Sequence, residues 1–235
     1  MSIILKNISK KYENMILFEN IKLEIDSGEF ITIVGKSGIG KSTLLSIIGS
    51  FEKVDDGEII FNGKNVKRPD CNRVIVFQTF DQLLPWKTVR ENIEFPLIHT
   101  KASGLDIEKL LDELDLKSVE NLYPHQLSGG MKQRVAIGRS IITKPQVLLM
   151  DEPFGSLDIG TRQNLQRLVL FLWKEYKITI IFVTHDVPEA VLLGNRILIL
   201  NESEIIEIEN PIMRPRDQMA PNYQMFVAEL IKNIK

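Results

Sequence analysis

The chain contains 235 residues, of which 44% are hydrophobic and 26% are charged. This composition is typical of a globular protein with a buried core, and it excludes a disordered chain, a collagen and a disulfide scaffold. Lys and Arg total 29 against 31 for Asp and Glu, so the net charge of -2 provides no basic field for nucleic acid. The single cysteine, Cys71, cannot form an internal disulfide, and no apolar run approaches the ~18 residues of a membrane-spanning helix. We therefore expect a chain that stays in the cytoplasm unless a partner recruits it to a surface.

The first third of the sequence is typical of strands separated by turns. Residues Ile3–Ile8 and Ile16–Ile25 alternate apolar and polar side chains, which is the pattern of half-buried strands. An apolar strand is expected over Phe30–Val34 and a further strand over Glu58–Phe61, each after a turn that contains glycine.

The middle third favours helices. Residues Thr88–Glu91 form a capping box, so a helix is expected to begin there and to end near Pro96. Apolar residues at 107, 110, 111 and 114 follow the spacing of an amphipathic helix.

The last third alternates buried strands with helices. Continuous apolar runs over Val147–Met150, Thr179–Val183 and Arg196–Leu200 are separated by helical patterns, including a long one that contains Leu165 and Tyr176. Such runs indicate a parallel sheet that is buried on both faces. The sequence therefore predicts an α/β core with a helical insertion at about 80–145.

A glycine-rich loop lies between the expected strand at Phe30–Val34 and an expected helix at Thr43–Ile48. The segment Gly35–Ser42 fits the pattern G-x-x-x-x-G-K-[ST] in the strand–loop–helix context that this phosphate-binding motif requires. Its glycines permit backbone N–H groups to converge on one anion, and the helix N-terminus adds partial positive charge. Lys41 is expected to reach the β- and γ-phosphates of ATP, and Ser42 to bind Mg²⁺. The expected nucleotide-binding residues of this loop are Gly35, Ser37, Gly38, Gly40, Lys41, Ser42 and Thr43.

Two carboxylates follow the apolar strand Val147–Met150. Ligands bind at the carboxyl ends of strands in open parallel sheets, so Asp151 and Glu152 are candidate site residues. Mg²⁺ keeps several waters and takes few carboxylates, which suits Asp151 as a ligand through bound water. Glu152 is expected to face the γ-phosphate and to polarise the attacking water.

A second helix N-terminus suited to an anion lies at Leu127–Arg134, which reads LSGGMKQR. Ser128 is the expected N-cap, and Gly129 and Gly130 open the helix. This segment resembles the signature of the ABC ATPases, the nucleotide-binding subunits of ABC transporters. In that family a head-to-tail dimer places the signature of one subunit against the ATP held by the phosphate loop of the other.

The resemblance implies roles for four further residues. Gln78, after the strand Arg73–Phe77, matches the glutamine that contacts Mg²⁺ and links to the membrane partner. Asp158 matches the D-loop aspartate, His185 matches the switch histidine on the γ-phosphate, and Tyr12 matches the aromatic residue that stacks on adenine.

The resemblance spans nearly the whole chain and implies a fold. That fold is an α/β P-loop NTPase with an N-terminal antiparallel β region and a helical subdomain inserted in the core. We expect a single ABC ATPase domain over residues 1–235, with a catalytic core at about 1–80 and 146–235 and the helical subdomain at about 81–145.

Further segments resemble one group within the family. Asp81–Trp86, together with Thr88–Asn92, is similar to the ATPases of nitrate, sulfonate and taurine importers, as is the run Arg214–Arg216. Phe154 matches a phenylalanine that is common in importers. In one interpretation, the segment around Trp86 helps to form a groove for a permease helix, since an aromatic residue beside proline suits such a contact. In the other, Trp86 is an ordinary core or surface aromatic residue.

The resemblance implies an ATPase that powers the import of nitrate, a sulfonate, taurine or a related small solute. The implied cofactors are ATP and Mg²⁺. The implied partners are a second, identical or paired ATPase subunit, two transmembrane permease subunits and, indirectly, a solute-binding protein, with no nucleic acid. The implied location is the cytoplasmic face of the cell membrane. Two alternatives remain open: the ATPase of an exporter or lipoprotein-release system, and a soluble ABC ATPase that serves no transporter.

Overall fold

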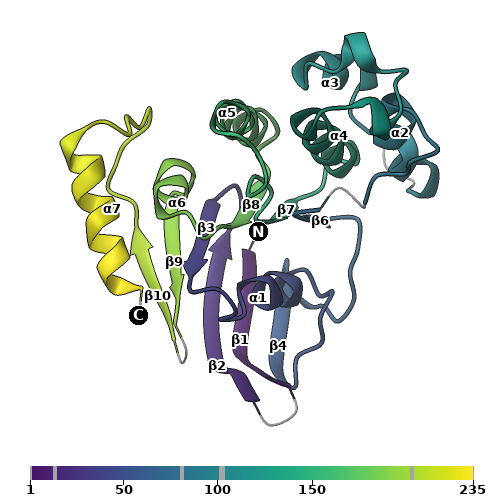
Figure 1. Cartoon of the computed structure of the whole chain (residues 1–235). Helices are drawn as coiled ribbons and strands as arrows, with labels where there is room; N and C mark the ends of the chain where they lie inside the picture. Colours follow the sequence, from purple (N-terminus) through teal and green to yellow (C-terminus); the bar gives the residue numbers. More distant parts are fainter. Residues whose placement is uncertain (1, 13–14, 80–81, 101–103, 202–203, 235) are drawn as a thin grey trace. The chain divides into compact units, whose positions relative to one another are not determined.

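The computed structural model describes residues 2–12, 15–79, 82–100, 104–201 and 204–234 (Figure 1). The chain divides into two compact units. Unit 1 consists of Met1–Pro69 and Thr179–Lys235, and unit 2 of Asp70–Ile178. The expected division into a catalytic core and a helical subdomain at about 81–145 stays a prediction.

Unit 1 begins with an antiparallel sheet in which the strand order is β2-β1-β4-β5. Residue Ile3 of β1 pairs with Ile25 of β2 on one side and with Phe61 of β4 on the other. Alternate residues of β2 are buried, as its polar–apolar alternation predicts. The strands are β1 (Ser2–Tyr12), β2 (Met15–Asp26), β4 (Asp56–Phe61) and β5 (Lys64–Asn65).

Unit 1 also contains a row of strands in the order β10-β9-β3-β8. The two neighbours of β3 run parallel to it, and β10 runs antiparallel to β9. Every residue of β3 and β8 is buried, which explains why both read as uninterrupted apolar runs. The elements are β3 (Phe30–Gly35), α1 (Lys41–Ile48), β8 (Thr179–Val183), α6 (Val187–Leu193), β9 (Arg196–Leu200), β10 (Ile205–Glu209) and α7 (Pro221–Asn233).

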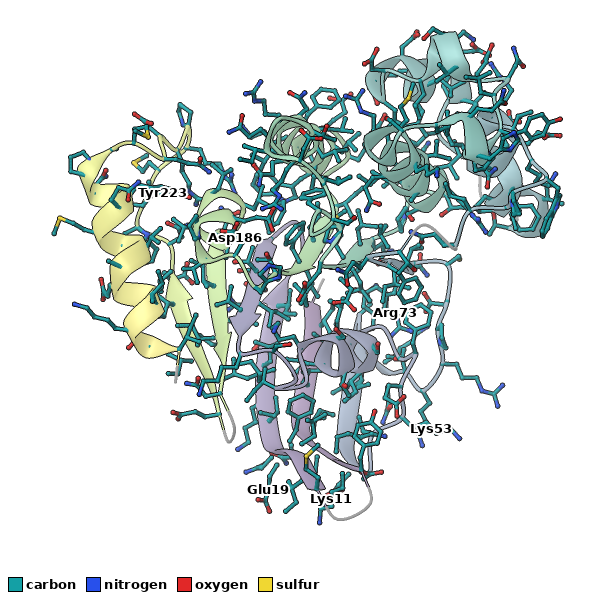
Figure 2. The ribbon with its side chains drawn as sticks, viewed as in Figure 1. Lys11, Glu19, Lys53, Arg73, Asp186 and Tyr223 are labelled. Atoms are coloured by element: carbon teal, nitrogen blue, oxygen red, sulfur yellow. The ribbon has the colours of Figure 1, made fainter. Side chains whose placement is uncertain are left out.

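The C-terminal helix α7 packs on α6 and completes an apolar cluster with β3 and β9 (Figures 1 and 2). The buried Tyr223 of α7 donates its hydroxyl to the backbone oxygen of Pro188, and burial raises the pKa of Tyr223 to about 12. Arg214 and Arg216 donate to the last carbonyl oxygens of α6, which have no partner within a helix. These contacts attach the C-terminal segment to the end of α6.

Unit 2 contains the parallel strand pair β6 and β7, with Arg73 beside Val147 and Val76 beside Met150. Helix α4 packs against α2, α5 and β6. The elements of unit 2 are β6 (Arg73–Val76), α2 (Val89–His99), α3 (Ile107–Glu113), the 3-10 turns η2 (Lys117–Val119) and η3 (Pro124–Gln126), α4 (Gly129–Ile141), β7 (Val147–Asp151) and α5 (Ile159–Tyr176).

The structure confirms the α/β class, the antiparallel N-terminal sheet and the buried strands. The expectation that the first helix of unit 2 ends near Pro96 is wrong, because α2 continues to His99 with Pro96 inside it. Proline removes one helical hydrogen bond, but packing of α2 on α4 outweighs this local penalty. Among the described residues, no helix is both long and apolar enough to cross a membrane.

Candidate functional site

In unit 1 the phosphate loop connects β3 to α1 as the motif predicts. Gly38 and Gly40 have φ angles of +78° and +103°, a left-handed conformation that side chains disfavour. Gly40 is also the N-cap of α1, so the loop opens directly onto a helix N-terminus. The Nζ atom of the buried Lys41 donates to the backbone oxygens of Gly35 at 2.9 Å and Lys36 at 2.8 Å. These bonds hold the ammonium group within the loop.

Close packing holds this loop against two strands. A Cβ atom on Gly40 would lie 2.8 Å from Cζ of Phe18 and 2.9 Å from Cδ1 of Leu17, both on β2. A Cβ atom on Gly35 would lie 2.5 Å from the backbone oxygen of Leu200 on β9. A side chain at Gly35 would therefore clash with the backbone of β9, and a side chain at Gly40 would also need an unfavourable backbone conformation.

Tyr12 lies at the end of β1, on the hairpin whose other strand contacts the phosphate loop. Its ring is 42% exposed. The Nζ atom of Lys10 lies over the ring, 4.8 Å from its centroid. Leu17 and Phe18 on β2 pack against Gly40, and β2 pairs with β1, which carries Tyr12. The pairing of these two strands therefore fixes where Tyr12 lies with respect to the phosphate loop.

His185 lies two residues after the end of β8, at the same end of the sheet as the phosphate loop that follows β3. Its side chain is exposed, whereas its neighbour Thr184 is buried. Thr184 donates its hydroxyl to Glu189 at 2.6 Å and accepts from the backbone N–H of Asp186 at 3.0 Å. Asp186 in turn accepts from the N–H of Glu189 at 3.0 Å as the N-cap of α6. This network determines the backbone on both sides of His185.

In unit 2 the carboxyl ends of β6 and β7 bring Gln78 and Glu152 together. A Cβ atom on Gly155 would lie 3.3 Å from Nε2 of Gln78 and 3.9 Å from Oε2 of Glu152, so both side chains approach this glycine. Asp151 ends β7 and is partly exposed. Glu152 has a φ of +43°, which is uncommon for a residue with a side chain. Such strain persists only where the surrounding structure imposes it, and it is concentrated at functional sites.

Two helix N-termini of unit 2 lie against each other. Ser128 caps α4 by accepting from the N–H of Met131 at 3.3 Å, and Asp158 caps α5 by accepting from the N–H of Thr161 at 3.0 Å. A Cβ atom on Gly130 would lie 2.5 Å from Cγ2 of Thr161, so only glycine permits this approach of the two helices. The hydrogen bonds from Thr161 hold the pKa of Asp158 below its usual range. The predicted residues Ser128, Gly129 and Gly130 at the start of α4 thus lie on a helix end that touches the start of α5, which Asp158 caps.

A cleft of about 780 Å³ in unit 2 is lined by Gln78 and Thr79, by Leu83 and Pro85, and by residues that sequence reasoning missed. The missed residues are Pro124, His125, Lys132 and Ser156. No local motif marks His125, because only the tertiary fold brings η3 beside Gln78. Trp86, next to Pro85, is 70% exposed. Asp81, the first residue of the importer-like segment, lies outside the described residues.

The segment that carries Trp86 is held by a buried amide. Asn92 is fully buried; its Oδ1 accepts from the N–H of Leu84 at 2.8 Å, and its Nδ2 donates to the backbone oxygens of Leu84, Lys87 and Thr88. Arg139 contacts the same segment by donating to the backbone oxygen of Gln82, and it lies over the ring of Phe95. The exposed tryptophan therefore stands on a segment with a defined backbone.

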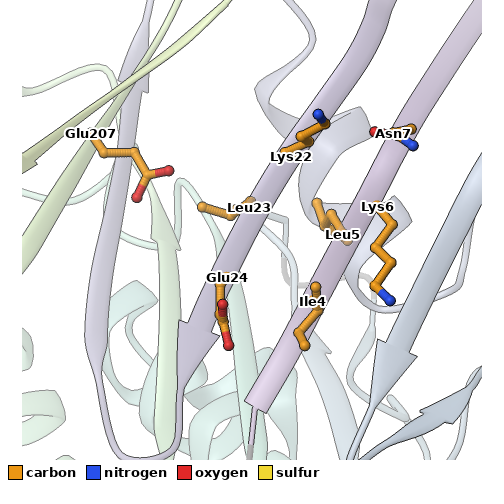
Figure 3. Close-up of a pocket in the computed structure, with 8 residues that line it drawn as sticks. All are labelled: Ile4, Leu5, Lys6, Asn7, Lys22, Leu23, Glu24 and Glu207. Carbon is orange, nitrogen blue, oxygen red and sulfur yellow. The ribbon is translucent and has the colours of Figure 1, made fainter.

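A shallower hollow of about 430 Å³ in unit 1 contains none of the predicted site residues (Figure 3). Its walls carry charges of both signs, with Lys6 and Lys22 on β1 and β2, Glu24 on β2 and Glu207 on β10 (Figure 3). Such a mixed surface selects no particular ligand charge. The predicted residues instead form one group in unit 1, around the phosphate loop, and one group in unit 2, around Gln78 and Ser128.

Comparisons with known proteins find relatives over most of the chain. A profile of the ABC transporter family matches residues 18–155. The aliphatic sulfonates import ATP-binding protein SsuB of Bacillus thuringiensis subsp. konkukian (strain 97-27) is 39% identical over 234 residues, which cover 98% of this chain and 93% of that protein. The nitrate import ATP-binding protein NrtC of Synechococcus elongatus is 41% identical over 230 residues, which cover 92% of this chain and 35% of that protein.

Among solved structures, the ATP-binding cassette MJ0796 in a dimeric post-hydrolysis state bound to ADP and Pi is similar in fold. The TM-score is 0.76 at 32% identity, and the match covers 90% of this chain and 100% of the solved chain.

The phosphate loop between a parallel strand and a helix in unit 1, and the acidic residues at the end of a parallel strand in unit 2, are typical of a P-loop NTPase. The relatives and the cassette structure make the class an ATPase that binds and hydrolyses ATP. The chain belongs to the ABC transporter family.

Proposed function

We propose that this chain is the ATP-hydrolysing subunit of an importer and powers uptake through a separate membrane permease. The observation that carries the proposal is the extent of the similarity to SsuB, which covers 98% of this chain. The names of SsuB and NrtC point to a sulfonate, nitrate or a related small solute such as taurine. The proposal includes a solute-binding protein that delivers this solute and a location at the cytoplasmic membrane face.

In the proposed reaction the residues of this chain act by position and charge. The backbone N–H groups of the phosphate loop and the ammonium of Lys41 bind the phosphates, and Tyr12 stacks on the adenine. Glu152 orients and polarises the attacking water, and His185 contacts the γ-phosphate. The uncommon backbone conformation of Glu152 and the hydrogen-bonded backbone on both sides of His185 support these roles.

Mg²⁺ is the proposed metal. The candidate ligands, Ser42, Gln78 and Asp151, all offer oxygen atoms, and Asp151 is a single carboxylate. Such a set fits Mg²⁺, which prefers oxygen ligands, takes few carboxylates and keeps several waters. When bound, the metal would neutralise charge on the phosphates, while Ser42, Gln78 and Asp151 would orient it.

The proposal also includes a second ATPase subunit. Ser128 and Gly129 lie at the surface where α4 begins, Gly130 packs there against Thr161, and the N-terminus of α4 suits an anionic group. Asp158 caps the adjacent helix α5 with its own carboxylate. In the proposed head-to-tail pair this surface faces the nucleotide held by the phosphate loop of the other subunit. The dimeric state of the MJ0796 cassette supports this arrangement.

The cleft beside Gln78 is the proposed docking place for a permease helix. Apolar and polar residues line it, and the exposed Trp86 lies on a rigid segment next to Pro85. An exposed aromatic residue with a defined backbone is typical of a binding hot spot. Because Gln78 also belongs to the nucleotide group of unit 2, a helix in this cleft would be sensitive to the state of the nucleotide.

The test is a co-purification from membranes. A tagged Glu152→Gln chain is extracted in mild detergent with ATP and Mg²⁺, and the proteins that accompany it are identified. We expect two polytopic permease chains to co-purify. The amount of permease recovered should fall more with Trp86→Ala than with Phe171→Ala, a control at an exposed aromatic residue on α5. Recovery of soluble partners or nucleic acid alone would contradict the importer, and recovery of an export permease would replace it.

A further inference from the structure

Beside Tyr12 lies a lysine that no motif singles out. Lys10 is 6% exposed, an unusual environment for a lysine, which is rarely buried unless it is paired. Its Nζ atom lies 4.8 Å from the centroid of the Tyr12 ring. Lys10 and Tyr12 are two residues apart on β1, so their side chains can lie on the same side of the strand.

The ammonium group of Lys10 is itself held by the segment that follows α1. It donates to Oε1 of Glu52 at 2.5 Å and to the backbone oxygen of Lys53 at 2.9 Å. The bond to Glu52 raises the pKa of Lys10, so the group keeps its charge at neutral pH. Two further bonds connect the same segment to β1: Asp55 accepts from the N–H of Lys11 at 2.7 Å and donates its own N–H to Ser9 at 3.0 Å.

These contacts restrict the ring of Tyr12 at one face. A cation over an aromatic face is attracted by the ring quadrupole and excludes another group from that face. An adenine that stacks on Tyr12 must then use the opposite face, and the ring must be held parallel to it. Figure 2 shows Lys11 of β1 and Lys53 of the segment after α1 at the same end of the antiparallel sheet. This segment is the one that is hydrogen-bonded to β1.

We propose that Lys10, held by Glu52, is a positioning residue that orients the Tyr12 ring for the adenine base. The inference rests on the proposed contact between Tyr12 and adenine. It adds the residue that holds the Tyr12 ring in the orientation this contact requires. Lys10 does not touch the nucleotide. It acts through Tyr12, and its effect is therefore confined to ligands that carry the base.

An ordinary structural role for the Lys10–Glu52 pair predicts a different pattern. If the pair only attached the segment after α1 to the sheet, its loss would disturb the phosphate loop and weaken all phosphate ligands alike. The two roles are distinguished by comparing ADP, which carries the base, with pyrophosphate, which lacks it. Neither probe is hydrolysed at the γ-position, so binding is measured without turnover.

The experiment is a double-mutant cycle on the full chain, with dissociation constants for both probes measured by calorimetry in the presence of Mg²⁺. We expect Tyr12→Ala to raise the Kd for ADP roughly ten-fold. Lys10→Met should raise it about two- to five-fold. Added to Tyr12→Ala, Lys10→Met should have no further effect, because the ring through which it acts is gone. Neither change should alter the Kd for pyrophosphate.

Three further variants complete the test. Lys10→Arg keeps the cation and should retain most of the ADP affinity. Lys11→Met removes the same charge from the adjacent, exposed lysine and should change nothing. Glu52→Gln keeps the Lys10 side chain but loosens it, and should raise the Kd for ADP in the same direction if Lys10→Met fails to fold.

The outcomes separate the two proposals. An unchanged Kd for ADP in Lys10→Met, an equal loss for pyrophosphate, or full additivity with Tyr12→Ala would overturn the role of Lys10 while leaving the contact of Tyr12 intact. If Tyr12→Ala leaves the Kd for ADP unchanged, the adenine contact itself is wrong, and the role of Lys10 is overturned with it.

Discussion

Gly40 is the position where the structure makes the sharpest energetic prediction, because an added methyl group would force the side chains of Phe18 and Leu17 to move. A Cβ atom would lie 2.8 Å from Cζ of Phe18 and 2.9 Å from Cδ1 of Leu17, and the backbone has a φ of +103°. A left-handed conformation costs a residue with a side chain about 1–2 kcal/mol. Overpacking of a filled site costs about 1–3 kcal/mol more. We therefore expect Gly40→Ala to lower the free energy of unfolding by about 2–5 kcal/mol.

Two other glycines separate the backbone effect from the steric one. Gly38 in the same loop and Gly28 in the turn before β3 each have a φ of +78°, and a Cβ atom on either would meet nothing within 4 Å. Alanine at these positions should therefore cost only the conformational term of about 1–2 kcal/mol. Gly28 lies outside the phosphate loop, so Gly28→Ala should leave ATP affinity unchanged, whereas both loop variants should weaken it.

The assay is urea unfolding of the three variants beside the parent chain, followed by ATP binding measured by calorimetry. We expect Gly40→Ala to be the least stable, with Gly38→Ala and Gly28→Ala similar to each other. Equal unfolding free energies for Gly40→Ala and Gly38→Ala would refute the packing of β2 on the loop. A loss of ATP affinity in Gly28→Ala would refute the prediction that only substitutions within the phosphate loop weaken ATP binding.

Three further predictions follow from other parts of the chain. Glu152→Gln should lower ATP turnover by about 10²–10⁴-fold with ATP affinity retained, since the amide cannot accept a proton; near-normal turnover, or an equal loss in the control Glu175→Gln, would contradict the role of Glu152. Gly138→Ala should destabilise the chain by about 1–2 kcal/mol in urea despite a better helix propensity, because its Cβ atom would lie 2.4 Å from Cδ1 of Leu114. Gly160→Ala should not destabilise, since its Cβ atom would only approach Oδ1 of Asp158 at 3.5 Å. In acid, unit 2 should lose stability as the pH falls below about 4, because carboxyl groups with lowered pKa values stabilise the folded state only while they are ionised. The groups concerned are Glu91, Glu108, Glu120 and Asp158, whose pKa values are lowered chiefly by hydrogen bonds from Thr88, Lys117, Arg90 and Thr161 respectively. The test compares the urea midpoint of unfolding at pH 7 with that at pH 3.5. Glu120→Gln should reduce the difference between the two midpoints, and a midpoint that does not change with pH would contradict the prediction.

Features that depend on neighbouring residues were predicted from the sequence. The capping box at Thr88 is present, with its side chain accepting from Glu91 and Glu91 accepting in return. Ser128 caps α4 as expected. The prediction failed at Pro96, because packing decides where α2 ends and local propensity does not. Helix propensity alone disfavours the glycine at 138 within α4, and the structure shows that it makes room for Leu114.

The sequence by itself determined most of the strands, the phosphate loop between β3 and α1, and the helix caps at Thr88 and Ser128. All of these depend on backbone conformation or hydrogen bonds within a few residues, so the local pattern is sufficient. Only the tertiary structure decided which distant side chains lie together. It places Gln78 and Glu152 against Gly155 and packs Gly130 against Thr161. It also brings His125 to the cleft that Gln78 lines, and it places the ammonium group of Lys10 over the Tyr12 ring, where Glu52 accepts a hydrogen bond from it. Such contacts arise from the packing of buried surfaces across the chain, and no local pattern of residues encodes them.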